Sequence, residues 1–391
     1  MRILIINYEY PPLGGGGGIE VRDLAEQLAK TNAVFVLTTG FHNLPPKETL
    51  NGVKIYRVPV LGRMDLPTAT TRSLISFFPS AFLYGLFLVP KIKPQVINAH
   101  FVVPSGLPAV FLARLYKIPF VLTLIGGDVY DPSKGISPHR HAILRWIIRK
   151  IMKRADKITA ISHDTKERAI RHYNAPEGIE VIPLGFVPPK VIGVDQAEKD
   201  FNPGNFSLDG SGLKINFVSI GRLVAQKGYF DLLRAFAALQ NENAVLYIIG
   251  DGPLLPELNF EIKKLGIESR VHMRGRVSDE DKYRMLRGSD IYVSASHHEG
   301  FGICFLEAMY AGLPIVSTNI GGQTDFLVPG RNAFLVNVGD LVKITRAMEQ
   351  LCNDGIMRKT MGKDNKKDVE NFLIQNTTKR HELIFQELAK K

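Results

Sequence analysis

The sequence predicts an α/β protein built from two Rossmann-like domains. A chain of 391 residues is longer than one hydrophobic core usually supports. Short β-branched runs alternate with segments of helical periodicity, which is the pattern of parallel α/β layers. This pattern breaks in a stretch rich in Pro, Gly, Asp and Asn, residues 188–213, where we place the interdomain linker. Two such domains in tandem predict that they face each other across a ligand cleft, at the carboxyl ends of their strands.

Each domain is expected to hold a series of parallel strands. In the first domain, residues 1–187, the predicted strands are Arg2–Tyr8, Ala33–Thr39, Val53–Val60, Val96–Phe101, Phe120–Ile125, Lys157–Ile161 and Glu180–Pro183. In the second domain, residues 214–370, they are Lys214–Ile220, Val245–Ile249, Arg270–Gly275, Ile291–Ser294, Pro314–Thr318 and Ala333–Val336. Residues 371–391 are expected to form a C-terminal helix that packs back onto the first domain.

The composition is that of a globular protein with an excess of positive charge. Lys and Arg number 49 against 38 Asp and Glu, so the net charge is +11. Such a surface attracts phosphorylated substrates, acidic lipids or nucleic acid. No nucleic-acid-binding motif is evident, so we expect no nucleic-acid partner. Two cysteines, Cys304 and Cys352, and a strand-like N-terminus favour the reducing cytoplasm.

Two segments of the first domain raise the question of membrane contact. Ser73–Pro90 carries no charged residue, but polar residues, Pro and Gly interrupt it, and it lies where a crossover helix is needed. A buried or surface-dipping helix is therefore favoured over a membrane span. The basic helix His139–Lys153 has apolar residues on one face and Arg and Lys on another. A solvated Rossmann helix and a helix on an anionic membrane both explain it, and both interpretations stay open.

Five consecutive glycines, Gly14–Gly18, follow the first strand and lead into a helix. Backbone without Cβ atoms can approach an oxygen-rich ligand closely, and the helix N-terminus supplies amide donors. The loop lacks the dinucleotide-binding glycine spacing, and no acidic residue ends the second strand, which argues against a nicotinamide cofactor. No Lys-Ser or Lys-Thr follows the glycines, so an NTPase P-loop is excluded.

The second domain carries the stronger cluster of polar residues. Gly221-Arg222 and Lys227 follow its first strand, and the two cations are suited to neutralising a diphosphate. Glu299 lies on the loop after Ile291–Ser294, and Glu307 lies in a helix expected from near Gly302 to Gly312. Amides around Gly302 and Ile303 would point into the cleft. Two carboxylates suit a ligand with several hydroxyl groups, such as a sugar and a ribose.

The acidic triplet Asp279-Glu280-Asp281 resembles a metal-binding motif of another fold. It directly follows Ser278, however, and acids in the first turn of a helix complement the helix dipole. We therefore interpret the triplet as a helix start and expect no metal site.

These residues resemble those of the retaining glycosyltransferases of family four, also called group 1, which have the GT-B fold. The matching motifs are Gly221-Arg222, Gln226-Lys227-Gly228, Gly250-Asp-Gly-Pro253, Glu299 and Glu307 with seven residues between them, Phe305–Met309, Ala311–Val316 and Gly321-Gly322. They cover nearly the whole second domain. The match is looser in the first domain, where it rests on Gly14–Gly18, Asn98-Ala-His100 and Gly126-Gly-Asp128.

The resemblance implies a role for each matching residue. Arg222 and Lys227 would bind the donor diphosphate, Glu299 the sugar hydroxyls and Glu307 the ribose. The catalytic residues would be Arg222, Lys227 and Glu299 together with His100 and Asp128 of the first, acceptor-side domain. The remaining donor contacts would come from Gly15, Gly16, Gly221, Gly252, Arg276, Val277, Gly302 and Ile303.

The resemblance also implies a reaction. A hexose-type sugar would move from a UDP- or GDP-linked donor, with retention and without a metal or another cofactor, to a lipid-linked or polysaccharide acceptor. The alternative is a nucleotide-sugar epimerase of the same fold.

Overall fold

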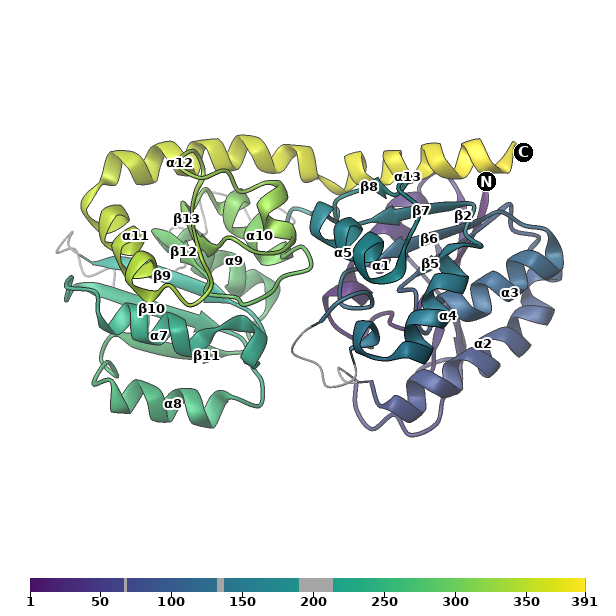
Figure 1. Cartoon of the computed structure of the whole chain (residues 1–391), viewed down its shortest axis with the longest axis horizontal. Helices are drawn as coiled ribbons and strands as arrows, with labels where there is room; N and C mark the ends of the chain where they lie inside the picture. The colour runs from purple at the N-terminus through teal and green to yellow at the C-terminus, as the bar shows by residue number, and fades with distance from the viewer. Residues whose placement is uncertain (67–68, 132–136, 190–213, 391) are drawn as a thin grey trace. The chain divides into compact units, whose positions relative to one another are not determined.

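The computed structural model describes residues 1–66, 69–131, 137–189 and 214–390, which form two compact units (Figure 1). Unit 1 comprises Met1–Val187 and Phe372–Lys391, and unit 2 comprises Pro188–Asn371. Each unit contains one mainly parallel sheet with helices on both faces, which confirms the predicted α/β class. Most of the predicted linker lies outside the described residues, and the cleft stays a prediction.

The sheet of unit 1 has eight strands in the order β3-β4-β2-β1-β5-β6-β7-β8. The strands are β1 (Arg2–Ile6), β2 (Ala33–Thr39), β3 (Lys47–Leu50), β4 (Val53–Val58), β5 (Val96–His100), β6 (Phe120–Leu124), β7 (Lys157–Ala160) and β8 (Glu180–Val181). All neighbours pair in parallel except β3, which pairs antiparallel with β4. Strand β3 is absent from the predicted strands. Its signal was the Asn51-Gly52 dipeptide, whose two positive φ angles of 48° and 84° suit a two-residue hairpin turn.

Alternate residues of β1 enter the two layers that cover this sheet. Leu4 and Ile6 face the helices α2 (Thr71–Ile92), α3 (Gly106–Tyr116), α4 (Ala142–Met152) and α5 (His163–Tyr173), with a short 3-10 helix η1 (Pro138–Arg140) before α4. Ile3 and Ile5 face α1 (Gly16–Leu28) and α13 (Ile374–Ala389). This alternation follows from the two-residue period of a strand, and both faces are apolar because helices cover both.

The C-terminal helix α13 completes unit 1, although the whole of unit 2 precedes it in the chain. Phe385 of α13 is fully buried against α1, and the Ile374 N–H donates to the carbonyl oxygen of Phe186 (2.9 Å). Figure 1 shows the yellow helix lying along this unit. A helix with so many buried apolar positions gains its stability from this packing.

Unit 2 has a six-stranded parallel sheet in the order β11-β10-β9-β12-β13-β14. Its strands are β9 (Ile215–Ile220), β10 (Ala244–Ile249), β11 (Val271–Gly275), β12 (Ile291–Val293), β13 (Ile315–Thr318) and β14 (Ala333–Val336). One face packs against α7 (Tyr229–Ala237), α8 (Leu255–Lys264) and α11 (Leu341–Asn353).

The other face of this sheet carries α10 (Ile303–Ala311), whose Phe305 ring lies 5.5 Å from that of Tyr292. Helix α9 (Asp279–Arg287) and helix α12 (Gly355–Asp368) both pack against α10. The described part of this half also holds the short 3-10 helices η3 (Ala225–Lys227), η4 (Gly322–Asp325) and η5 (Val369–Phe372). The predicted helix from near Gly302 to Gly312 is confirmed, since these two glycines flank α10.

Candidate functional site

The strand order of unit 2 reverses between β9 and β12, which are neighbours in the sheet although two strands separate them in sequence. The loops that follow these two strands therefore leave the same sheet edge side by side, the usual ligand position in an open α/β sheet. The first loop carries Arg222 and Lys227, and the second carries Glu299. The fold thus brings together residues that are far apart in the sequence.

Lys227 and Glu299 form an ion pair across these loops. Their side chains are largely buried, with exposed fractions of 17% and 9%. Burial disfavours the charged form of Lys227, but the Glu299 carboxylate outweighs burial and keeps the lysine pKa above its ordinary value. In this structure each residue neutralises the other, so neither is an isolated buried charge.

Hydrogen bonds to backbone carbonyl groups fix the two loops to each other. Gln226 Nε2 donates to the carbonyl oxygen of His298 (2.8 Å), and the His297 N–H donates to the carbonyl oxygen of Gln226 (2.8 Å). Gly228 has a positive φ of 62°, and a Cβ atom there would lie only 1.9 Å from the carbonyl oxygen of Ala295. A side chain at residue 228 would therefore push the loops apart.

Arg222 lies on the same loop in a different environment. Its side chain is exposed and makes no hydrogen bond or ion pair with any residue that the structure describes. The neighbouring Gly221 accepts a hydrogen bond from Tyr229 Oη (3.2 Å), and Gly252 sits beside the backbone of Leu223. Because the guanidinium of Arg222 has no such partner among the described residues, it can bind an anion without first breaking an internal ion pair.

Helix α10 begins beside Glu299. Gly302 is its N-cap, in a left-handed conformation with φ 89°, and no side chain caps the helix start. The first amides of an α-helix, here including that of Ile303, have no partner within the helix, and they carry partial positive charge. Burial raises the pKa of the Cys304 thiol in this first turn to about 11, so the thiol stays neutral near pH 7.

Glu307 lies one turn further along α10 and is paired with a residue that was not among the predicted site residues. Lys282 Nζ lies 2.7 Å from Glu307 Oε1 and 2.8 Å from Asp279 Oδ1, and Tyr283 Oη donates to Glu307 at 3.4 Å. Burial raises the pKa of Glu307, and Lys282 opposes that rise. No sequence signal links residues 282 and 307, because their contact depends on how α9 packs against α10.

The acidic triplet before Lys282 starts a helix, as predicted. Ser278 caps α9 by accepting a hydrogen bond from the Asp281 N–H (3.0 Å), and all three acids lie in the first turn. Their carboxylates pair with Lys282 and Arg284 of the same helix. Just before Ser278, Arg276 is exposed and Val277 half-buried, on the loop that leaves β11.

In unit 1 the strand order reverses between β1 and β5, and the glycine loop after β1 lies at that point. Gly15 is the N-cap of α1, which has no side-chain cap. A Cβ atom at Gly15 or Gly16 would meet no atom within 4 Å, whereas one at Gly17 would lie 2.4 Å from the Phe101 ring. Packing within the chain therefore requires glycine at 17 but not at 15 or 16, where the backbone is open to a ligand.

His100 ends β5 and is fully buried. Its Nε2 lies 2.7 Å from Asn98 Oδ1, and its Nδ1 lies 3.4 Å from Glu20 Oε2 of α1. The His381 ring of α13 lies 6.4 Å away. The catalytic role that the resemblance implies for His100 stays a prediction, and the sequence showed a strand end but not the burial of this side chain.

Asp128 is also buried, with both carboxylate oxygens in use. The Val102 N–H donates to Oδ2 (2.7 Å), and the Ile125 N–H donates to Oδ1 (3.1 Å). The carboxylate therefore links the loops that follow β5 and β6. The catalytic role that the resemblance implies for Asp128 stays a prediction, and these contacts give the residue a role in positioning the two loops.

The arrangement in unit 2 combines charges of both signs at one sheet edge. An exposed guanidinium, a buried lysine and an uncapped helix start can stabilise negative charge, and two largely buried carboxylates can accept hydrogen bonds from hydroxyl groups. This chemistry suits a ligand that contains both a phosphate and hydroxyl groups.

Comparisons with known proteins agree with this interpretation. Residues 15–185 match a glycosyl transferase 4-like domain, and residues 210–368 match the glycosyl transferases group 1. An uncharacterized glycosyltransferase of Methanocaldococcus jannaschii is 29% identical over 392 residues, which cover 97% of this chain and 96% of the relative.

Two solved structures show the same fold. Sucrose-phosphate synthase from Thermosynechococcus elongatus has a TM-score of 0.83 at 20% identity, covering 99% of both chains. The Anabaena protein HepE in complex with UDP-glucose has a TM-score of 0.75 at 16% identity, covering 99% of this chain and 100% of that one. The predicted GT-B fold class is thereby confirmed. Because glycosyltransferase family models match both halves of the chain, the protein belongs to the group 1 glycosyltransferases.

Proposed function

We propose that this glycosyltransferase moves a hexose-type sugar from a UDP- or GDP-linked donor to a lipid-linked or polysaccharide acceptor, with retention of the anomeric configuration. The observation that carries the proposal is the cluster of Arg222, Lys227, Glu299 and Glu307 at the reversal point of the unit 2 sheet. The complex of the similarly folded HepE with UDP-glucose supports a nucleotide-sugar donor.

The leaving diphosphate would be stabilised by fixed positive groups. As the glycosidic bond breaks, negative charge grows on the diphosphate, and preorganised cations and amides lower the barrier. Arg222 is exposed and unpaired among the described residues, so it can form a fork with a phosphate. Lys227 and the amides near Gly302 and Ile303 supply the remaining positive charge. We therefore propose that transfer needs no divalent metal.

The hydroxyl groups of the donor would be bound by the two carboxylates. Glu299 would accept hydrogen bonds from the sugar, and Glu307 from the ribose, as the resemblance to the family implies. When the donor binds, its hydroxyls and phosphates would replace part of the Lys227–Glu299 contact. Arg276 and Val277, at the end of β11, would lie against the base.

Unit 1 would bind the acceptor and approach the donor with its glycine loop. Gly15 and Gly16 are the two glycines of that loop whose positions no neighbouring atom restricts. We assign His100 and Asp128 to positioning rather than to direct catalysis, because both are buried and hydrogen-bonded within unit 1. His100 lies against Glu20 of α1, and Asp128 would fix the loop around Val102.

Retention follows from a same-face reaction in which the leaving phosphate helps to deprotonate the acceptor hydroxyl. The acceptor oxygen then forms its bond to the anomeric carbon on the face that the diphosphate leaves. The proton moves to the phosphate oxygen, so no enzymatic nucleophile is needed. The positive groups of unit 2 stabilise the same phosphate throughout the step.

A thermal-shift panel of UDP-, GDP- and ADP-sugars tests the donor assignment. A donor at about 100 times its dissociation constant stabilises the folded protein by about 2.7 kcal/mol. We expect the sugars of one base to give the largest thermal shift. Incubation with that donor and an acceptor should then yield a product whose anomeric configuration, measured by NMR, is the same as that of the donor. A product of opposite configuration would refute retention. Conversion of the donor sugar to its epimer without any acceptor would indicate an epimerase instead.

A further inference from the structure

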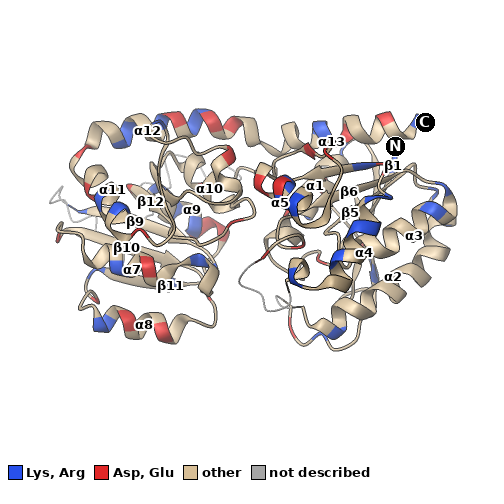
Figure 2. Ribbon diagram, viewed as in Figure 1, with Lys and Arg blue, Asp and Glu red and all other residues tan. Residues whose placement is uncertain are grey.

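Helices α2, α3 and α4 of unit 1 share an unusual composition. None of them contains Asp or Glu, although they hold Arg72, Lys91, Arg114, Arg145, Arg149 and Lys150. Figure 2 shows blue but no red on these three helices. The acidic residues of the connecting segments, Asp128 and Asp131, are each only 5% exposed. The outer surface of these helices is therefore positively charged.

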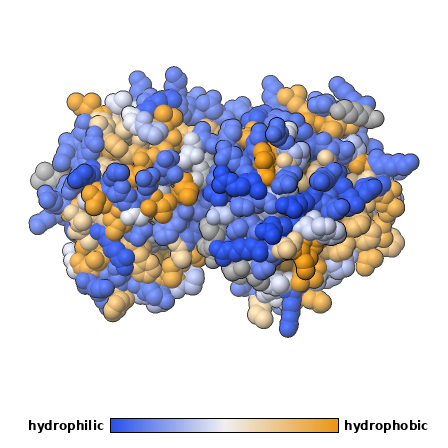
Figure 3. Space-filling model, in the orientation of Figure 1, coloured by the Kyte–Doolittle hydropathy of each residue, from blue (hydrophilic) through white to orange (hydrophobic). Residues whose placement is uncertain are grey.

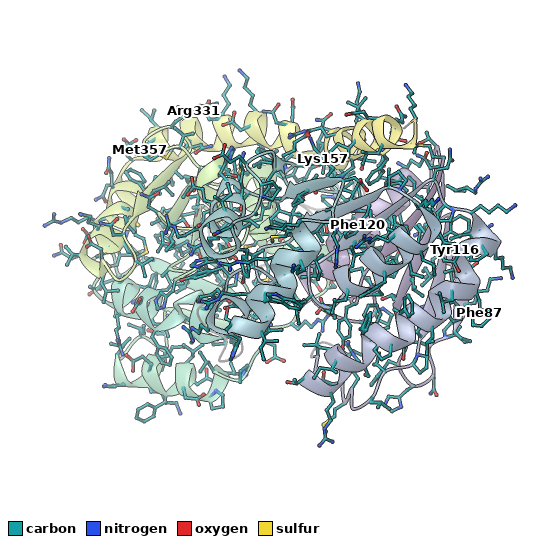
Figure 4. The ribbon with its side chains drawn as sticks, turned by 45° about the vertical axis from the view of Figure 1, so that its right-hand side comes forward. Phe87, Tyr116, Phe120, Lys157, Arg331 and Met357 are labelled. Carbon is teal, nitrogen blue, oxygen red and sulfur yellow. The ribbon has the colours of Figure 1, made fainter. Side chains whose placement is uncertain are left out.

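The same surface exposes large apolar side chains. On α2 the exposed residues Ile75, Leu83 and Phe87 follow one another at intervals of eight and four positions, so they form one inclined stripe along the helix. Phe87 is 80% exposed, and Figure 4 places it at the outer edge of the molecule. On α4, Ile143 and Trp146 are 75% and 61% exposed. Single exposed apolar residues are common, but several of them on the helices of one layer mark a contact surface.

Contacts within unit 1 hold these helices together as one face. Tyr116 Oη of α3 donates to the carbonyl oxygen of Leu86 in α2 (2.8 Å), and the Phe78 and Phe111 rings lie 5.7 Å apart. Helix α3 also packs against α4. In Figure 3 orange, apolar surface and strongly blue residues lie close together on the right-hand part of the view. The apolar stripe and the basic residues thus belong to one surface.

We propose that this face of α2, α3 and α4 docks unit 1 onto an anionic lipid monolayer. The exposed Phe87 and Trp146 would enter the boundary between headgroups and acyl chains, and Arg149 and Lys150 would contact headgroup phosphates. Lipid explains both properties of the surface, since an amphipathic face with basic residues binds through buried apolar area and charge attraction together. We call this surface the α2–α4 face.

Three alternative roles fit the observations less well. Nucleic acid would explain the charge but not the exposed aliphatic stripe. A second copy of this chain, docked by two-fold symmetry, would bring two like-charged surfaces together. Helix α2 is long and apolar enough to cross a membrane. However, its Phe77 and Ala81 are fully buried in unit 1, and its Ser73 accepts a hydrogen bond from Tyr8 Oη (2.6 Å). A membrane-spanning α2 would expose this core, so the helix lies along the bilayer.

Vesicle sedimentation with the full chain tests the proposal. The two lipid compositions are phosphatidylcholine alone and an equimolar mixture of phosphatidylcholine and phosphatidylglycerol. We expect the protein to bind only the mixture and to dissociate as salt is raised. Each basic residue near an anionic surface contributes about a fivefold factor in affinity. The variant R149E/K150E should therefore bind at least about 25-fold more weakly. F87S/W146S should lose at least about tenfold through lost apolar burial.

The chain offers matched controls on α8 of unit 2. Phe260 is 69% exposed, like Phe87, and Lys263 and Lys264 occupy the last turn of α8 as Arg149 and Lys150 do in α4. We expect F260S and K263E/K264E to bind vesicles as the wild type does. All altered side chains are on the surface, and unchanged thermal unfolding and donor binding verify the fold.

Two results would overturn the proposal. One is failure of the wild type to bind the anionic vesicles, or equal binding by the α4 and α8 variants. The other is binding of an oligonucleotide, weakened by R149E/K150E, in the absence of vesicle binding. The assay does not measure sugar transfer, so its outcome is independent of the proposed function.

Discussion

Replacing Lys282 by Met would remove the counter-charge of the buried Glu307. The two side chains are 17% and 11% exposed, and the atoms Nζ and Oε1 lie 2.7 Å apart. At an effective dielectric constant of about 20, the attraction is about 6 kcal/mol, from 332/(20 × 2.7). Desolvation of the lysine offsets part of this, and removing one partner of a buried pair costs about 3 to 5 kcal/mol. We expect Lys282→Met to lower the free energy of unfolding by about 3 kcal/mol, the lower end of this range.

The variant should depend on pH with opposite signs in two assays. Burial already raises the pKa of Glu307, and without Lys282 that pKa rises further. The folded state then binds more protons than the unfolded state, so the free energy of unfolding falls as the pH rises. In the proposed role of Glu307 the ionised carboxylate binds the ribose, so the affinity for the nucleotide should rise with pH. The wild type should show much weaker trends in both assays.

Urea unfolding and calorimetric titration with the preferred nucleoside diphosphate, from about pH 5 to pH 8, measure the two trends. The matched control is Asp279→Asn, which removes the other partner of Lys282. Asp279 is 90% exposed, so its ion pair contributes little and the control should resemble the wild type. If the Met variant and the wild type show parallel pH profiles in both assays, Lys282 does not control the ionisation of Glu307.

Four further changes test the site and its surroundings. Lys227→Ala should lower kcat by about 10² to 10³, through about 2.7 to 4 kcal/mol of lost transition-state stabilisation, and unchanged steady-state kinetics would remove Lys227 from the site. Glu299→Gln should lower transfer while calorimetric binding of the nucleoside diphosphate, which lacks the sugar, stays nearly constant; equal losses would contradict the assigned contact. Transfer should survive excess EDTA, and a loss that Mg²⁺ or Mn²⁺ reverses would contradict the role of the fixed cations. Burial lowers the pKa of His381 to about 3, so only the unfolded state protonates as the pH falls below about 6.5. In urea unfolding, wild-type stability should therefore fall by about 1.4 kcal/mol per pH unit more than that of His381→Leu.

The sequence was sufficient for the parallel core of both sheets because buried strands leave strong local signals. The strands Ala33–Thr39 and Ala333–Val336 were predicted with their observed bounds, and both are apolar runs with clear ends. The edge strand β3, Lys47–Leu50, is exposed and polar, so hydrophobic periodicity could not reveal it. Its turn dipeptide was the available signal.

The candidate site was predictable where spacing along the chain fixes position in space. Glu299 and Glu307 flank a helix start, so the chain itself places them near one another. Their lysine partners come from η3 and α9, and those contacts depend on tertiary packing. The burial of His100 and Asp128 has the same cause, because α1 and the loop after β5 close over them. Motif matching identifies residues but not whether their side chains reach a ligand.

The two lysine–carboxylate pairs suggest how a buried site can keep charged groups for binding both a neutral sugar and a charged phosphate. A carboxylate that loses water without gaining a partner takes up a proton, and it then no longer serves as a pure acceptor. Lys282 opposes this at Glu307 before any ligand arrives, and Lys227 gives Glu299 an ion-pair partner. The two lysines should behave differently once a donor binds, however. In the proposed mode of donor binding, Lys227 would direct its charge to the diphosphate once sugar hydroxyls reach Glu299. Lys282 is also paired with Asp279 on its own helix, and we assign it no contact with the diphosphate. It would therefore remain paired with Glu307 throughout the reaction. Substitution at 227 should therefore act mainly on turnover, and substitution at 282 mainly on nucleotide affinity.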